Sequence, residues 1–257
     1  ELFNGFKKIF YSLIDKINFS QCIRVFFDSN YQINFFKNKG YNTKKFSLIS
    51  RGSVKGVNLN IFYKNDNLRQ IQRSKYNLKN TDKVILFLGR LDHNKGVVCL
   101  LEAFKILSKD NNNYFLFLVG KNEMMIEKEL KNYKFLINKI FVLPHTNHPE
   151  SFYNLCDLVC IPSLREGFGS VAVEASACEK PIVSSNIHSL SESVIDKFNG
   201  IKFNVNDSID LSIKIKSLLD DDIISTKYGK NGRSYVTKYY DSKKVINDFY
   251  KQLLNNI

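Results

Sequence analysis

From Lys83 onward, short apolar runs alternate with longer stretches whose apolar positions repeat at helical spacing. Six apolar runs predict strands, at residues 84–88, 114–119, 140–143, 158–161, 181–184 and 200–203. Helices are predicted between most of them, at residues 97–107, 124–133, 150–154, 171–178 and 190–196. Because the runs lack the alternation of a half-exposed strand, they predict a parallel sheet covered by helices on both faces. Such sheets bind ligands beyond the carboxyl ends of their strands.

The chain before this region supplies fewer elements. Residues 1–19 predict an amphipathic helix, residues 22–27 and 46–50 two short strands, and residues 28–38 a helix between them. We expect the apolar stripe of the first helix to pack on a sheet, although apolar residues opposite lysines also suit a membrane interface. These elements are too few for an independent doubly wound domain, and the chain opens without Met. We therefore expect it to be a piece of a longer protein.

Polar and helical patterns occupy the remaining segments. Residues 64–82 are polar and predict a partly helical segment, and three helices close the chain at residues 208–219, 223–239 and 242–255. An aspartate run, Asp220 to Asp222, stands between the first two of these helices. Because aspartate caps helix N-termini well, the run predicts a turn with an N-cap in preference to a metal site.

Composition narrows the class of protein. Of 257 residues, 44% are hydrophobic, which is ample for a core. No apolar run reaches the roughly 18 residues of a membrane span. The net charge of +13 suits nucleic acid, an anionic membrane or phosphate ligands, but the lysines are spread, which disfavours nucleic acid. The five cysteines are interpreted as core residues of a reducing compartment, and neither they nor the histidines show metal-site spacing.

Residues 165–175 carry the most distinctive chemistry. They follow a buried strand and lead into an apolar helix, and Gly167 and Gly169 allow a sharp turn that leaves amide groups uncovered. Unpaired amides at a helix N-terminus attract anions. Glu174 lies within the apolar helix, where a carboxylate needs hydrogen-bond donors such as the hydroxyls of a sugar or ribose. The alternative is that Glu166 favours the helix dipole and Glu174 faces water.

A second candidate site follows the strand predicted at residues 84–88. The loop after it carries Arg90 and Lys95 and leads into the next helix. Arginine presents a planar fork suited to phosphate oxygens, and lysine adds a compact charge. The two cations therefore predict a diphosphate site at the ligand-binding edge of the sheet, unless they are merely solvated loop cations.

Together these motifs resemble those of the retaining family-4 (group 1) glycosyltransferases. The matching features are Glu-x7-Glu from Glu166 to Glu174, Gly-Arg-Leu-x-x-x-Lys-Gly at residues 89–96, and a Gly-Ser-x-x-Gly-Val-Asp linker at residues 52–58. The chain departs from the family pattern at Asn58 and Asn186, where the family has aspartate, and at His188 and Ser189, where it has glycine.

The resemblance implies an α/β fold of the GT-B type. It implies a doubly wound, parallel, Rossmann-like donor domain together with the C-terminal part of a truncated N-terminal Rossmann-like domain. We place the end of the N-terminal, acceptor-side domain at residues 1–52 and the nucleotide-sugar domain at residues 53–240. Residues 241–257 are expected to form a C-terminal helix that packs back toward the N-terminal domain.

The resemblance also implies roles for individual residues. In the family the arginine and lysine hold the donor diphosphate, the first glutamate contacts donor-sugar hydroxyls and the second binds the ribose. The implied catalytic residues are Arg90, Lys95 and Glu166. The implied donor-binding residues are Gly89, Gly120, His145, Gly167, Phe168, Gly169, Ser170 and Glu174. No metal ligand and no cofactor is implied.

The implied enzyme moves a hexose or N-acetylhexosamine from a UDP- or GDP-sugar to a glycan or lipid-linked acceptor, with retention of configuration. It would serve bacterial polysaccharide, lipopolysaccharide or glycolipid synthesis, in the cytoplasm at the inner face of the cell membrane. Its expected partners are the donor, the acceptor and, peripherally, anionic membrane, but no nucleic acid. We expect this fragment alone to bind nucleotide weakly and to turn over poorly, because most acceptor-side residues of the family lie outside it.

Other function classes remain open. A GT-B sugar-nucleotide epimerase or phosphorylase would differ in its products, and a noncatalytic sugar-nucleotide binding module would bind without turnover. A basic nucleic-acid binder would lose affinity steeply with salt. Residues 167–172 also fit the dinucleotide fingerprint Gly-x-Gly-x-x-Ala, but they follow the fourth strand of the sheet and not the first, which argues against that interpretation.

Overall fold

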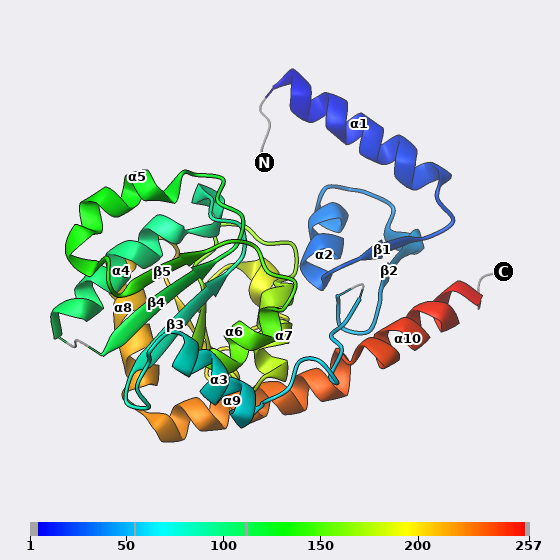
Figure 1. Ribbon diagram of the computed structural model, residues 1–257. Coiled ribbons are helices and arrows are strands. Elements are labelled where there is room, and N and C mark those ends of the chain that lie inside the picture. The colour runs from blue at the N-terminus through cyan, green and yellow to red at the C-terminus, as the bar shows by residue number, and fades with distance from the viewer. Residues whose placement is uncertain (1–4, 54, 111–112, 255–257) are drawn as a thin grey trace.

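The computed structural model describes residues 5–53, 55–110 and 113–254, which form a large sheet region and a small N-terminal region (Figure 1). The large region holds a parallel sheet of six strands in the order β5–β4–β3–β6–β7–β8. The strands are β3 (Lys83–Leu88), β4 (Tyr114–Val119), β5 (Ile140–Leu143), β6 (Leu158–Ile161), β7 (Ile182–Ser185) and β8 (Gly200–Phe203). The strand prediction is confirmed. Because the order reverses between β3 and β6, the sheet has a switch point at its carboxyl edge.

Both faces of the sheet are buried, as the sequence predicts. Successive side chains of β3 point to opposite faces. Ile85 and Phe87 belong to the core beside α4 and α8, whereas Val84 and Leu86 belong to a second core beside α6 and α7. The helices of this region are α3 (Asp66–Lys75), α4 (Val97–Asp110), α5 (Ile126–Leu130), α6 (Pro149–Leu155), α7 (Ser170–Ala177), α8 (Ser208–Leu219) and α9 (Asp222–Tyr239). The α/β, doubly wound prediction is therefore confirmed.

The N-terminal region is a two-stranded parallel sheet with two helices. Its elements are α1 (Phe6–Gln21), β1 (Val25–Phe27), α2 (Asn30–Asn38) and β2 (Phe46–Leu48). Four phenylalanine rings pack together between these elements, with Phe19 5.1 Å from Phe36 and Phe27 4.7 Å from Phe46, measured between ring centroids. Ser29 caps α2 by accepting a hydrogen bond from the amide of Gln32. This region has a small aromatic core of its own.

The apolar stripe of α1 does not pack on a sheet, so that expectation is wrong for the described side chains. Ile9 is 61% exposed and Leu13 is 54% exposed. The physical reason is size, because the two-stranded sheet cannot cover a 16-residue helix. Near its C-terminal end α1 does join the region, where Phe19 meets the other rings. Residues 1–4 of the predicted helix lie outside the described part of the chain.

The helix predicted at residues 190–196 is also wrong. The chain there forms a single 3-10 turn, His188–Leu190, followed by irregular turns. The side chain of Asn199 accepts a hydrogen bond from the amide of Ile195 and donates one to the carbonyl of Ser193. In a helix, the amide of Ile195 and the carbonyl of Ser193 would bond to other main-chain groups. Because the side chain of Asn199 bonds to them instead, it favours the irregular conformation. The segment at 124–133 likewise divides into α5 and a 3-10 helix, Lys131–Leu136.

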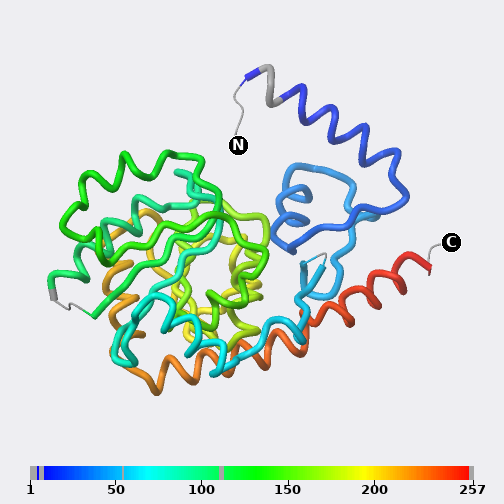
Figure 2. The backbone as a smooth tube through the Cα atoms, in the orientation of Figure 1, coloured from blue at the N-terminus to red at the C-terminus, as the bar shows by residue number. Residues whose placement is uncertain are grey.

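The C-terminal helix links the two regions. Figure 2 shows α10 (Ser242–Leu254) continuing from α9 beneath the sheet region to the side of the N-terminal region. There Gln252 donates a hydrogen bond to the carbonyl of Leu48, and Asp248 accepts one from the amide of Ser50. Residue 54 of the linker and residues 255–257 lie outside the described residues, and the domain boundaries stay a prediction. In the described ranges, none of the helices has the length and apolar content needed to cross a bilayer.

Candidate functional site

The loops that carry the predicted site residues all follow carboxyl ends of strands. One cavity of about 170 Å³ lies where the loop after β3 meets the loop after β6, at the switch point of the sheet. Its lining includes the predicted residues Gly89, Arg90, Lys95, Glu166, Gly169 and Ser170. The structure therefore brings the two cations and the first glutamate to one cavity, together with the N-terminus of α7.

Lys95 and Glu166 form an ion pair across this cavity. Their Nζ and Oε1 atoms are 2.6 Å apart, and only 21% and 15% of the two side chains are exposed. The hydroxyl of Ser163 donates a second hydrogen bond to the same carboxylate oxygen, at 2.8 Å. An anionic ligand would compete with Glu166 for Lys95, and the carboxylate would then be free to accept ligand hydroxyls.

Close backbone contact fixes the loop that carries Lys95. Gly96 adopts a left-handed conformation with φ 69°, and a Cβ atom there would lie 2.0 Å from the carbonyl oxygen of Pro162. The amide of Leu164 donates to the carbonyl of Asn94 at 2.7 Å. Glycine is therefore required where the two loops meet. Asp92 caps the short turn by accepting from the amide of Lys95.

A second glycine sets the start of α7. Gly169 has φ 83°, and a Cβ atom there would lie 2.4 Å from Cδ2 of Leu190. Ser170 begins the helix directly behind the cavity wall. The first amide groups of a helix lack helical partners and carry a partial positive charge, so this wall attracts anions.

Arg90 stands between two cavities. Besides the cavity described above, it lines a larger one of about 730 Å³ together with Gly120, Asn122, Glu127 and His145. Its guanidinium contacts Glu123 at 3.0 Å and Asp92 at 3.5 Å, and 58% of the side chain is exposed. An elongated ligand could therefore occupy both cavities and pass Arg90 at their junction.

Glu174 lies deeper than the other predicted residues. The hydroxyl of Tyr153 donates to its Oε2 atom at 2.9 Å, and Lys55 from the linker approaches Oε1 at 3.9 Å. Burial raises the pKa of the Glu174 carboxyl, while the Tyr153 hydrogen bond and the charge of Lys55 oppose that rise. Sequence reasoning missed both partners, because nothing in the local pattern connects α6 or the linker to α7.

This raised pKa predicts a pH-dependent effect of Glu174→Gln. Burial disfavours the ionised carboxylate in the folded state. The native protein therefore loses stability as the pH rises from about 4.5, the usual pKa of a glutamate, through the raised pKa of Glu174 in the folded state. The variant does not carry this charge. We therefore expect the unfolding free energy of Glu174→Gln, relative to that of the native protein, to be higher at pH 7.5 than at pH 4. Denaturant titration at both pH values measures this difference. An equal difference at both pH values would contradict the prediction.

Two further predicted residues, Phe168 and Gly167, differ in their surroundings. The ring of Phe168 is 7% exposed and packs against Tyr240 at 5.4 Å between centroids, in an apolar cluster that includes Val57. Only its main chain could therefore meet a ligand in this arrangement. Gly167 is exposed beside the cavity loop. Among the described residues, no group of three or more histidine, cysteine or acidic side chains could hold a metal ion.

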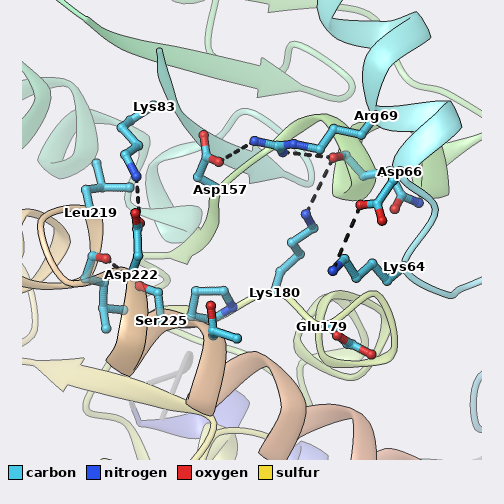
Figure 3. Close-up of a pocket in the computed structure, with 14 residues that line it drawn as sticks. Lys64, Asp66, Arg69, Lys83, Asp157, Glu179, Lys180, Leu219, Asp222 and Ser225 are labelled. Carbon is cyan, nitrogen blue, oxygen red and sulfur yellow. Dashed lines mark hydrogen bonds and ion pairs between the residues drawn. The ribbon is translucent and has the colours of Figure 1, made fainter. Parts of the chain in front are cut away.

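A separate hollow of about 390 Å³ lies at the opposite, amino edge of the sheet (Figure 3). Most of its charged side chains have protein partners. Asp157 contacts Arg69 at 2.6 Å and Arg73 at 3.5 Å, and Lys180 donates to the carbonyl of Cys156 at 3.0 Å. Burial lowers the pKa of Lys180. These contacts stabilise the fold, and none of the predicted site residues lines the hollow.

Comparisons with known proteins point to one family. The family model described as glycosyl transferases group 1 matches residues 69–235. The chain is 28% identical over 203 residues to the capsular polysaccharide biosynthesis glycosyltransferase CapM of Staphylococcus aureus, covering 78% of this chain and 53% of CapM. A Campylobacter jejuni enzyme, N-acetylgalactosamine-N,N'-diacetylbacillosaminyl-diphospho-undecaprenol 4-alpha-N-acetylgalactosaminyltransferase, is 28% identical over 215 residues, covering 80% of this chain and 56% of the enzyme. The chain thus spans about half the length of these curated relatives.

Solved structures show the same fold. The C-terminal domain of the group 1 glycosyl transferase LpcC from Francisella tularensis superposes with a TM-score of 0.64 at 25% identity, covering 72% of this chain and 98% of that domain. HepE of Anabaena, in complex with UDP and glucose, superposes with a TM-score of 0.80 at 20% identity, covering 90% of this chain and 63% of HepE. The predicted GT-B architecture is confirmed. The chain matches only part of the length of these longer structures.

Proposed function

Since the chain belongs to the family of group 1 glycosyl transferases, we propose that its paired cavities bind a nucleoside diphosphate sugar for a retaining, family-4 transfer reaction. One observation carries the proposal: Lys95 and Glu166, 71 positions apart in sequence, meet in the cavity that Arg90 also lines. Cations on one side and a carboxylate on the other suit a ligand that has both phosphates and hydroxyls.

The donor would extend across both cavities. Its diphosphate lies between Arg90, Lys95 and the N-terminus of α7, its sugar hydroxyls donate to Glu166, and its ribose hydroxyls donate to Glu174. The base then occupies the larger cavity beside Gly120 and His145. UDP in the HepE complex supports a uridine donor, and a GDP-sugar is the second candidate.

Charge develops on the diphosphate during transfer. The bond from the anomeric carbon to the diphosphate oxygen breaks, and its electron pair stays on the diphosphate. The acceptor hydroxyl oxygen bonds to the same face of the anomeric carbon, and its proton passes to the departing diphosphate. Fixed positive groups stabilise this developing charge and require little reorganisation. Arg90 and Lys95 fill that role in our proposal, without a metal ion.

The names of the relatives support a proposal for the acceptor class. CapM is described as a capsular polysaccharide enzyme, and the Campylobacter enzyme by its diphospho-undecaprenol substrate. We infer that a hexose or N-acetylhexosamine is transferred to a glycan or lipid-linked acceptor, at the cytoplasmic face of the membrane. A sugar-nucleotide epimerase, a phosphorylase or a noncatalytic binding module would share the cavities but not the glycoside product.

Calorimetric titration tests the proposal. UDP and GDP, each with and without an attached hexose, and the monophosphates UMP and GMP are titrated into the protein without added divalent metal. We expect one nucleoside diphosphate to bind at least about tenfold more tightly than the corresponding monophosphate, because the second phosphate meets the charged groups of the cavity. Equal affinity for monophosphate and diphosphate would overturn the assignment. Incubation with donor and acceptor, followed by mass analysis, distinguishes transfer from epimerisation and phosphorolysis.

Glu174→Ala should weaken binding of the preferred nucleoside diphosphate by about 1.5–3 kcal/mol, because a hydrogen bond to a charged group is lost. Calorimetry at neutral pH measures the change. Glu129→Ala on α5 is the matched control, because it removes a glutamate from a different helix, whereas Glu174 lies one turn beyond Ser170 and Val171, which line the small cavity. Affinity equal to that of the native protein would exclude Glu174 from the ribose site.

A further inference from the structure

The two oxygens of the Glu174 carboxylate have different surroundings. Oε2 accepts the hydrogen bond from the hydroxyl of Tyr153 at 2.9 Å. Within the described ranges, no residue donates a hydrogen bond to Oε1, which the ammonium of Lys55 approaches at 3.9 Å. Glu174 lies one turn beyond Ser170, which lines the small cavity. Oε1 can therefore accept a hydrogen bond from a ligand that extends along this wall.

The ring of Tyr153 is fixed in the core. It is fully buried and belongs to the same apolar cluster as Ala172 and Ala175 of α7. Its centroid lies 6.0 Å from that of the Phe62 ring. A ring that is packed on all sides keeps one rotamer, so its hydroxyl has a fixed direction. That direction is toward the carboxylate of Glu174.

Side chains from other elements fix the helix that carries Tyr153. At the C-terminal end of α6, Arg69 donates to the carbonyls of Leu155 and Cys156, each at 2.9 Å. Lys180 also donates to the carbonyl of Cys156, at 3.0 Å. Cations at this end of a helix satisfy carbonyls that lack helical partners and interact favourably with the helix dipole. The tyrosine hydroxyl is therefore in place before any ligand binds.

The hydrogen bond between Tyr153 and Glu174 has one polarity. Burial and the charge of Glu174 raise the pKa of Tyr153 well above its usual value, so the hydroxyl stays protonated and donates. Burial raises the pKa of the Glu174 carboxyl, whereas the bond from Tyr153 and the charge of Lys55 oppose that rise. Tyr153 therefore favours the ionised form of a carboxylate that burial would otherwise neutralise.

The other titratable and charged groups nearby do not replace this bond. Burial raises the pKa of the Cys156 and Cys178 thiols to about 12, so both stay neutral near pH 7. Arg233 on α9 donates to two main-chain carbonyls, each at 2.8 Å. A change of pH on the acidic side of neutrality therefore acts on this cluster through Glu174.

We propose that Tyr153 is a positioning residue for the donor, which anchors the carboxylate of Glu174 and presents Oε1 as an anion to a ribose hydroxyl. The inference rests on the proposed function, because it takes Glu174 as the ribose ligand. Tyr153 acts only through Glu174, since its ring is fully buried. An ionised acceptor forms a stronger hydrogen bond than a neutral one, so the anchored carboxylate binds the ribose more tightly.

Tyr153→Phe tests the proposal, because it removes the hydroxyl and keeps the ring. Affinity for the preferred nucleoside diphosphate is measured by calorimetry at pH 8 and pH 5.5. We expect it to fall about threefold at pH 8, where the effect is the lost anchoring bond. At pH 5.5 we expect a fall of about tenfold or more, because each unit of rise in the pKa of Glu174 lowers the ionised fraction by up to about a factor of ten. A loss of equal size at both pH values, or no loss, would overturn the proposal.

Two comparisons isolate the effect. Tyr76→Phe is the matched control, because the half-buried Tyr76 ring packs on Phe117, at 4.9 Å between centroids, and its hydroxyl is not bonded to Glu174. We expect this variant to bind like the native protein at both pH values. In protein that already carries Glu174→Gln, Tyr153→Phe should change the affinity by the same factor at both pH values, because the titrating group is gone. A pH-dependent loss in that background would contradict the assignment.

Unfolding midpoints are measured on the same samples, and the titrations are made below them. A structural role alone would lower the midpoint of Tyr153→Phe but leave the affinity of the folded protein and its pH dependence unchanged. That result would remove Tyr153 from the donor site while the donor site itself stands. If the native protein binds no nucleoside diphosphate, the proposed function itself fails. The two failures therefore give different results.

Discussion

Arg90→Ala is expected to lower the turnover of a glycosyl transferase built on this chain about a hundredfold or more, by analogy with loss of one oxyanion-hole donor. The guanidinium stands where two cavities meet and is held by Glu123 and Asp92. A diphosphate that bridges the cavities would pass directly beside it. Because negative charge grows on that diphosphate as the sugar leaves, the contact is worth more in the transition state than in the bound donor.

Steady-state release of nucleoside diphosphate in the presence of acceptor measures this effect. The expected pattern is a large fall in kcat with a smaller rise in the KM of the donor. Lys128→Ala is the matched control, because this lysine lies on α5 and lines neither donor cavity. Unfolding should barely change in Arg90→Ala, since exposed ion pairs contribute at most about 1 kcal/mol. An unchanged kcat would remove Arg90 from the proposed catalytic group.

The sheet and its loops could be predicted because their signals are local. A strand buried on both faces must be apolar throughout, as in Leu158–Ile161, and the following loop needs glycine where backbones touch. Gly96 and Gly169 have left-handed conformations, and a Cβ atom at either would overlap a neighbour. The positions of Arg90, Lys95 and Glu166 follow, because carboxyl ends of adjacent parallel strands share one edge.

Features that depend on residues far away in the sequence could not be predicted. An apolar stripe such as that of α1 indicates an amphipathic helix but does not say what covers it. The turns after Leu190 depend on the side chain of Asn199, which supplies hydrogen bonds that a helix would otherwise make within itself. Tyr153 and Lys55 reach Glu174 only because α6 and the linker fold against α7. Each of these outcomes is decided by tertiary contact.

Asp157→Ala is expected to lower the free energy of unfolding by about 3 kcal/mol or more, the usual effect of breaking a buried ion pair. The carboxylate accepts hydrogen bonds from Arg69, from Arg73 and, at 2.7 Å, from the amide of Val84 at the start of β3. Only 4% of the Arg73 side chain is exposed. Burial lowers the pKa of Arg73, and the charges of Asp157 and, less strongly, Asp82 oppose that change. Removal of the Asp157 carboxylate therefore leaves a buried cation without its main opposing charge.

Asp222→Ala is the matched control for this loss, because Asp222 lines the same hollow and also pairs with a cation, Lys83 at 2.7 Å (Figure 3). Since 82% of its side chain is exposed, its removal should cost no more than about 1 kcal/mol. Chemical denaturation of both variants measures the difference. Equal losses would mean that solvent reaches Arg73 readily. A loss confined to Asp157→Ala, with nucleotide affinity retained, means that the amino edge of the sheet stabilises the fold while the carboxyl edge binds ligand.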